Sequence, residues 1–328
     1  GGSTGSVVST VYYAQVKNDG TLTSWAATST LPAVRQFHGM STYNGYLFVA
    51  GGHDGTNVVS TVYSAQIKSD GTLNSWYTLT AIPAVRQQLG VVGANGYLFA
   101  IGGESANGTT STSTVYSAKI NGDGTVGTWA TLTQTLTTAL YGFGVATYNN
   151  YIYVTGGYTG AAAVSTTYSA QTNSDGTLTA WTTNTAIPAL TQYHSSFAIN
   201  GYLYITGGCP TSCTTPVSTS YSSQIASTGT LAAWSTLQTI PVITSNHASV
   251  GTNGYLVIAG GTNDNGTTKL STVYSAPLSS TALAQNASTS FATGNLFDLW
   301  NDEVSKFSVD YSGLVSTNAG IQFARNSR

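Results

Sequence analysis

Short runs of apolar and small polar residues fill most of the chain, and nearly every run ends at a turn signal. One stretch reads, in order, HGMSTY (38–43), Asn-Gly, YLFVAGG (46–52), STVYSAQI (60–67), Asp-Gly and TLNSW (72–76). Short runs rich in Tyr, Val, Thr and Ile are typical of β-strands, and no stretch has helical periodicity over a useful length. Asn-Gly and Asp-Gly between such runs predict hairpins with type I′ turns, in which both residues take positive φ. The pattern therefore predicts an all-β protein.

The four-segment pattern repeats along the chain. NGYLFVAGG at 44–52 returns in related form at 95–103, 149–157, 200–208 and 253–261. The tryptophans that close each period are spaced by 51, 53, 52 and 53 residues, at Trp25, Trp76, Trp129, Trp181 and Trp234. Periods of about 50 residues with four strands each predict the blades of a β-propeller.

The repeated residues resemble the kelch repeat. The features that match are the Gly-Gly pair after an apolar strand, the Tyr of the third segment and the Trp of the fourth, over about residues 1–280. The resemblance implies a kelch-type propeller of four-stranded antiparallel blades, and it is strongest to kelch-like repeat proteins of bacterial cell surfaces. We therefore predict a propeller over 1–285, followed by a β-rich tail over 286–328.

The number of blades stays open between five and six. The chain begins with Gly1-Gly2, which correspond to the end of a second strand, and STALAQ (280–285) replaces the last tryptophan-bearing strand. The N-terminal strands could complete the fifth blade. Alternatively, the hairpin at 295–310 could supply inner strands to a sixth, composite blade, and joining both termini would remove unpaired sheet edges.

Charge is scarce, since Asp, Glu, Lys and Arg make up 6% of the residues, against roughly 25% in typical soluble domains. A surface of hydroxyls and amides favours an extracellular or cell-surface location. The net charge of −2 and the scattered basic residues argue against nucleic acid as a partner. No apolar run reaches the length of a membrane span. Because the sequence begins at Gly1 without Met, we interpret it as a processed or trimmed product.

Two cysteines, Cys209 and Cys213, lie four residues apart in GGCPTSC. A disulfide between them would fit an oxidising compartment, and two free thiols are the alternative. A zinc site would need two more ligands, and no histidine lies nearby. The patterns NGT at 107–109, NGT at 265–267 and NAS at 286–288 match N-glycosylation sites at Asn107, Asn265 and Asn286, although such short patterns also arise by chance.

The topology of an antiparallel blade divides the loops between two faces of the ring. The turns between strands one and two and between strands three and four form one face, here called the turn face. The loops between strands two and three and the linkers between blades form the other, here called the variable face, because its loops at 53–58, 104–111, 158–163, 209–216 and 262–269 differ between repeats. Recognition residues usually lie on such loops. The candidate ligand-binding residues are His53, Asp54, Glu104, Tyr158 and Asp264.

No catalytic or metal constellation is evident. His38, His194 and His247 share one repeat position with Leu89 and Phe143, which indicates packing rather than a metal site. Arg35 and Arg86 are too few for the arginine cluster of a sialidase. A galactose-oxidase site would need copper held by His and Tyr and a Tyr–Cys crosslink. A glycosidase needs two facing carboxylates, and Asp54, Glu104 and Asp264 lie on separate repeats. We therefore predict no enzyme activity, no cofactor and no metal.

Three functions are carried forward. The leading prediction is a non-catalytic extracellular binding or adhesion module, with a protein or glycan at the variable face. The alternative is a structural subunit of an extracellular filament or surface layer that self-associates through residues 286–328. The tail motivates this second function, because it holds seven of the chain's twenty charged residues. A carbohydrate-active enzyme is the third.

Overall fold

The computed structural model describes residues 1–105, 110–211, 213–264, 266–278, 295–301, 304–310 and 315–317. The three predicted glycosylation sites and the segment 280–285 lie outside the described residues. The chain divides into two compact units, Gly1–Pro277 and Leu278–Arg328. The described residues contain strands but no helix, and hence no helix that could cross a membrane.

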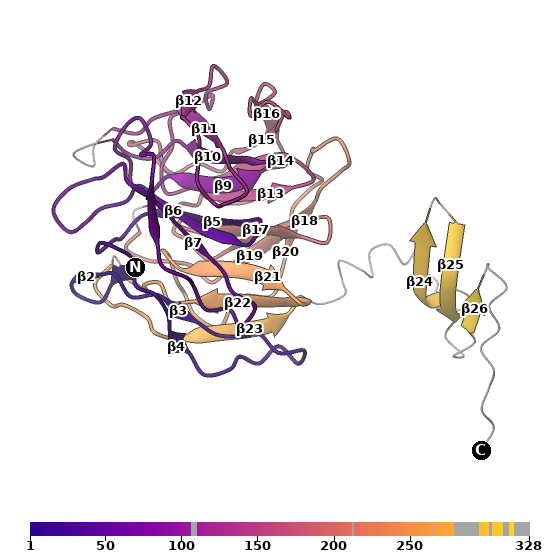
Figure 1. Ribbon diagram of the computed structural model, residues 1–328. Coiled ribbons are helices and arrows are strands. Elements are labelled where there is room, and N and C mark those ends of the chain that lie inside the picture. Colours follow the sequence, from indigo (N-terminus) through magenta and orange to yellow (C-terminus); the bar gives the residue numbers. More distant parts are fainter. Residues whose placement is uncertain are drawn as a thin grey trace. The chain divides into compact units, whose positions relative to one another are not determined.

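Each antiparallel sheet of the first unit corresponds to one repeat of the sequence (Figure 1). The N-terminal residues form two pairs, β1 (Gly2–Ser3) with β2 (Val7–Val8) and β3 (Tyr12–Tyr13) with β4 (Ala26–Ala27). Four blades of four strands follow: β5 (Gly39–Tyr43), β6 (Tyr46–Ala50), β7 (Val62–Gln66) and β8 (Tyr77–Leu79); β9 (Gly90–Ala94), β10 (Tyr97–Ile101), β11 (Val115–Lys119) and β12 (Ala130–Thr131); β13 (Gly144–Tyr148), β14 (Tyr151–Thr155), β15 (Thr167–Gln171) and β16 (Thr182–Asn184); β17 (Ser195–Ile199), β18 (Tyr202–Thr206), β19 (Ser220–Gln224) and β20 (Ser235–Thr236). The last blade has three strands, β21 (Ala248–Thr252), β22 (Tyr255–Ala259) and β23 (Val273–Pro277).

The blades form a propeller, which confirms the predicted fold class. The inner strands β5, β9, β13, β17 and β21 pack each against the next. Apolar residues of the first three strands are buried between neighbouring blades, as Phe99 and Ile152 are, both at 0% exposure. In the second unit, β24 (Asn295–Asn301), β25 (Val304–Asp310) and β26 (Val315–Thr317) form a three-stranded antiparallel sheet.

The Asn-Gly and Asp-Gly turns differ in conformation. Asn44 and Gly45 take φ of 46° and 77°, as a type I′ turn requires. Asp70 does not take positive φ, so the prediction of a type I′ turn at Asp70-Gly71 is wrong. Instead, Gly71 N donates to Lys68 O at 2.9 Å, and the Asp70 carboxylate accepts from Thr72 N at 2.9 Å. The Asp-Gly pair thus ends a longer turn, in which the aspartate side chain binds the backbone two residues ahead.

The fourth strand of each blade also lies later than predicted. TLNSW (72–76) precedes the strand, and β8 begins at the residue after Trp76. The tryptophan instead attaches its blade to the preceding one through the indole N–H. Trp76 Nε1 donates to Ser29 O at 2.9 Å, and the same bond recurs from Trp129 to Thr80, from Trp181 to Gln134 and from Trp234 to Thr185.

The Gly-Gly pair joins each blade to the next. Gly103 N donates to Leu140 O, in the linker of the following blade, at 2.8 Å. Gly102 and Gly103 have φ of 55° and 92°, and a Cβ on Gly102 would lie 2.8 Å from the same Leu140 carbonyl oxygen. Glycine is therefore needed both for the backbone conformation and for the close approach. Gly52, Gly157 and Gly208 make the same bond, to Arg86, Thr191 and Thr244, at 2.7 to 2.8 Å.

The N-terminal pairs occupy a sixth position in the ring, between the fifth and the first described blades. Gly1 N donates to Thr10 O and Gly2 N to Arg35 O, both at 2.6 Å, as Gly51 and Gly52 do one repeat later. On the other side, the ring of Tyr255, at the start of β22, covers Gly20. Tyr46 covers Gly124 in the same way across the next pair of blades but one. Figure 1 accordingly shows β3 and β4 beside β22 and β23.

The repeated histidines are buried between blades. His194 Nε2 lies 2.9 Å from Thr155 Oγ1, and His247 Nε2 lies 2.9 Å from Thr206 Oγ1, so each links its blade to the threonine before the preceding Gly-Gly pair. Burial lowers the pKa of His194 to about 3 and that of His247 to about 4. Within the described part of the chain, no three His, Cys, Asp or Glu side chains are grouped to hold a metal.

Two tryptophans at the same repeat position test the packing between blades. Trp129 is 8% exposed and Trp25 is 46% exposed. We expect Trp129→Ala to lower the free energy of unfolding by about 3–5 kcal/mol, because it removes a buried ring and its hydrogen bond. Trp25→Ala is the matched control and should cost less than about 1 kcal/mol. Denaturant titration of both variants measures the difference, and equal costs would contradict the described position of Trp129.

Candidate functional site

On the variable face, each blade brings a loop residue beside a linker residue. The residue directly after the Gly-Gly pair forms an isolated β-bridge with the linker that enters the same blade. The pairs around the ring are Gln36 with His53, Gln87 with Glu104, Tyr141 with Tyr158, Gln192 with Cys209, and Ser245 with Thr262. Three of the predicted site residues, His53, Glu104 and Tyr158, therefore occupy equivalent places in successive blades.

A ring of left-handed residues lies next to these pairs. Phe37, Gln88, Gly142, Tyr193 and Asn246 have φ between 52° and 58°. Their backbones are hydrogen-bonded from blade to blade: Gln88 N donates to Phe37 O, Gly142 N to Gln88 O, Tyr193 N to Gly142 O, and Asn246 N to Tyr193 O, at 2.6 to 3.2 Å. This belt fixes the linkers, and with them the side chains of the variable face.

Glu104 and Tyr158 come together with residues that the sequence did not single out. Glu104 is 4% exposed, and Gln87 Nε2 donates to its carboxylate at 2.7 Å. The ring of Tyr141 lies 5.4 Å from that of Tyr158 and 6.4 Å from that of Tyr193, measured between centroids. Gln87, Glu104, Tyr141, Tyr158 and Tyr193 thus form a cluster at the second, third and fourth described blades, called here the Glu104 cluster.

Burial controls the protonation of the cluster. It raises the pKa of Glu104, and hydrogen bonds from Gln87 and Tyr141 only partly oppose the shift. Burial also raises the pKa of Tyr141, and it raises that of Tyr193 to about 12, with the charge of Glu104 adding to both shifts. The phenols therefore stay protonated at neutral pH, and one carboxyl group lies among three aromatic rings. Such a group can accept a cation, because aromatic faces and a carboxylate both attract positive charge.

The other predicted residues hold their own loops. Asp54 Oδ1 accepts from Thr56 N and Asn57 N at 2.8 and 2.7 Å, and His53 Nδ1 accepts from Gly55 N at 3.0 Å. The Asp264 carboxylate accepts from Thr262 Oγ1, Thr267 N and Thr268 N. These bonds, first those from Thr268, lower the pKa of Asp264 to about 2. Asp54 and Asp264 are exposed, so their main visible role is to shape the loops.

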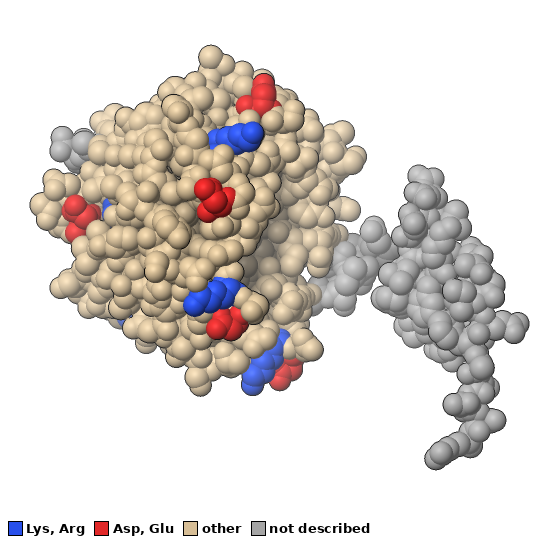
Figure 2. Space-filling model, in the orientation of Figure 1, with Lys and Arg blue, Asp and Glu red and all other residues tan. Residues whose placement is uncertain are grey.

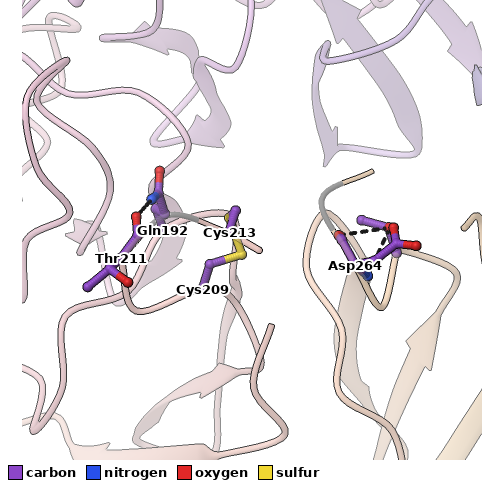
Figure 3. The surroundings of a disulfide bond; sticks show 6 residues. Gln192, Cys209, Thr211, Cys213 and Asp264 are labelled. Carbon is purple, nitrogen blue, oxygen red and sulfur yellow. Dashed lines mark hydrogen bonds between the residues drawn. A yellow bond between two sulfur atoms is a disulfide. The ribbon is translucent and has the colours of Figure 1, made fainter. Parts of the chain in front are cut away.

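Cys209 and Cys213 are joined by a disulfide in the variable-face loop of the fourth described blade. The linker residue Gln192 donates its Nε2 to Thr211 O at 2.6 Å, inside the same small loop (Figure 3). Figure 3 also shows Asp264 on the loop of the next blade. The disulfide and the Gln192 bond together tie this loop to its linker.

The turn face has a depression that the sequence analysis missed. Its volume is about 400 Å³, and it is lined by Tyr43, Gly93, Ala94, Asn95, Thr147, Tyr148, Asn149 and Asn150. The sequence signal was the Tyr that ends the first strand in two blades, beside Gly93-Ala94 in the blade between them. Small residues between two tyrosines leave space, but the uniform turn sequences drew attention away from this face.

Comparison with known proteins supports the propeller. The kelch motif matches residues 35–64, which extend from the linker before β5 into β7. Kelch-like protein 36 of Rattus norvegicus and that of Mus musculus are each 27% identical over 150 residues, which is 44% of this chain. The match spans only 22% of the length of these curated relatives. The solved structure titled "Structure of YjhT" superimposes with a TM-score of 0.64 at 14% identity, covering 81% of this chain and 87% of that one.

The fold thus places the chain in the class of β-propellers. Together, the motif match, the similar proteins and the arrangement of the blades show that it is a kelch-repeat β-propeller.

The raised pKa of Glu104 predicts how E104Q changes stability with pH. The folded protein binds this proton more tightly than the unfolded chain. The contribution of the carboxyl to stability is therefore fully present below the unfolded pKa of about 4.3 and is lost as pH rises through the folded value. We expect the stability of the wild type relative to E104Q to fall between about pH 4 and pH 7. Thermal melts of both proteins measure it, and a difference that grows with pH would contradict the burial of Glu104.

Proposed function

We propose that this propeller is an extracellular, non-catalytic binding module, and that it docks its partner on the variable face. Kelch propellers act as protein-binding scaffolds, which supports the general class. The extracellular location rests on the low charge of the chain, seen in Figure 2 as isolated blue and red patches on a mostly uncharged surface. A cell-surface adhesion role is the more specific form of this proposal.

The Glu104 cluster supplies the chemistry for recognition. A carboxyl group that is 4% exposed, held by Gln87 and surrounded by tyrosine rings, is the observation on which the proposal depends. Burial disfavours the charged carboxylate in the free protein, and a bound cation would remove that penalty. A lysine or arginine side chain of a protein partner fits this requirement. It would place its charge by Glu104 and its methylene groups against the rings of Tyr141 and Tyr158.

The belt and the loops provide a rigid frame for such a contact. Gly142 has φ of 58°, and the Tyr193 ring lies so close that a Cβ on Gly142 would be 2.6 Å from it. The position of the Tyr193 ring is therefore fixed by a backbone that only glycine can adopt without strain. Binding to preorganised side chains loses little conformational entropy, which favours a recognition role.

Arrays of peptides and glycans, probed with the labelled full chain, test this function. We expect the peptides that bind to contain Lys or Arg, and E104Q to weaken them at least about tenfold, because the buried partner charge is lost. D123N is the matched control, since it removes one negative charge from an exposed Asp-Gly turn on the turn face. It should leave the affinity within about twofold.

Three results would contradict the proposal. Binding peptides without basic residues would exclude the cationic contact. Equal loss in E104Q and D123N would indicate a general charge effect. A lack of binding to every peptide and glycan would argue against a recognition module. If glycans alone bind and E104Q is unaffected, the ligand site lies elsewhere on the propeller.

Self-association through residues 286–328 stays a second proposal, since the three-stranded sheet β24–β26 has edges that pair readily with other strands. The described residues provide no observation that favours the third function, a carbohydrate-active enzyme.

A further inference from the structure

The sixth position of the ring contains outer strands without inner ones. In the described blades, the third strand pairs with the second over five residues, as β7 does with β6. At the sixth position, β3 corresponds to the third strand and pairs with β4 alone. The edge of β3 that faces the centre of the ring is thus free to pair among the described residues.

The two inner strands that border this position are exposed where their counterparts are buried. Met40 on β5 is 56% exposed, whereas Val91, at the same place on β9, is 2% exposed. Val250 on β21 is 50% exposed, whereas Phe197, at the same place on β17, is 8% exposed. The directions agree, because glycines at the same alternation as Met40 point to the preceding blade, as Gly93 points to Tyr43. Met40 and Val250 therefore face the sixth position from its two sides.

The belt of the variable face ends at the same place. Its hydrogen bonds run from Phe37 to Asn246 through the described blades, and Phe37 and Asn246 are its two ends. Phe37 is 41% exposed at one of these ends. Gly261 likewise is the one second glycine of the pairs without an inter-blade carbonyl partner in the described part of the chain. Backbone edge, apolar side chains and belt thus all stop at the borders of one gap.

We propose that this gap is a docking surface for a two-stranded β-hairpin with short apolar strands, supplied by a partner polypeptide. The occupant is defined by the interfaces that the protein already has. Each space between neighbouring blades is filled by a hairpin of two five-residue strands joined by a two-residue turn, such as β9 and β10. A docked hairpin would pair its second strand with β3 and place its apolar side chains against Met40 and Val250. This mode of binding is strand addition to a sheet edge, with backbone bonds for affinity and apolar pockets for specificity.

The surface is distinct from the Glu104 cluster and does not depend on the function proposed for it. It also differs from an ordinary exposed edge, because the hairpin would be covered on both faces. A hairpin alone is marginally stable in water, so both partners gain from the contact.

The chain's own sequence provides the probe. A synthetic peptide with the sequence of residues 90–101, GVVGANGYLFAI, is the β9–β10 hairpin with its Asn-Gly turn. Added to the full-length protein at about a hundredfold excess over its Kd, we expect it to raise Tm by about 5 °C. A peptide of the same composition in scrambled order should cause no shift.

Variants of the two bordering strands locate the effect. M40K and V250K place a charge in the gap and should abolish the shift in Tm. L190K is the matched control, since Leu190 is 44% exposed on another blade, and it should retain the shift. Without peptide, all three variants should melt within about 2 °C of the wild type, because each residue is exposed.

Several outcomes would overturn the proposal. One is the absence of any shift in Tm with the hairpin peptide. A second is a shift that persists in M40K and V250K, since binding would then be elsewhere. A third is a drop in the Tm of M40K and V250K, but not of L190K, without peptide. That drop would mean that another part of this chain, or a second copy of it, already covers the gap.

Discussion

One backbone hydrogen bond between blades determines most of this structure. The second glycine of each pair donates its N–H to a carbonyl in the linker of the next blade, as Gly103 does to Leu140. The bond requires positive φ at both glycines and leaves no room for a side chain. It therefore fixes where the second strand ends, how close the next blade lies, and which loop residue stands beside which linker residue. Buried histidines and the tryptophan N–H groups reinforce the same contact from either side.

The chemistry of the variable face follows from this constraint. The residue after the Gly-Gly pair is always held beside a linker residue, so the side chains at these places differ between blades while the backbone does not. One pair is Gln87 with Glu104 and the next is Tyr141 with Tyr158, which creates a buried carboxyl group beside aromatic rings. At another pair, Cys209 belongs to a loop closed by a disulfide. A constant scaffold with variable side chains is the arrangement that recognition proteins use.

The repeat made the architecture predictable from sequence, because glycine pairs, Asn-Gly turns and tryptophans recur at fixed intervals and each has a local physical cause. The predictions failed where the cause was tertiary. The Asp70-Gly71 turn is longer than expected because the Asp70 side chain binds Thr72, and the fourth strand starts after Trp76 because the indole reaches the preceding blade. Glu104 and Tyr158 were chosen from loop variability, but Tyr141 and Tyr193 belong to linkers whose proximity only the closed ring reveals. The exposed Met40 and Val250 were equally hidden, since their repeat positions are buried in other blades.

Hydrogen exchange of the glycine amides tests the central claim, that each blade is held by the bond from its second glycine and that the ring is open at one position. In the full chain, the amides of Gly103, Gly157 and Gly208 should exchange at least about a hundredfold more slowly than that of Gly261. The first three donate to the linker of the next blade, and Gly261 has no such partner among the described residues. Equal protection of Gly261 would show that the ring is already closed. Rapid exchange at all four glycines would show that the bond does not hold the blades together.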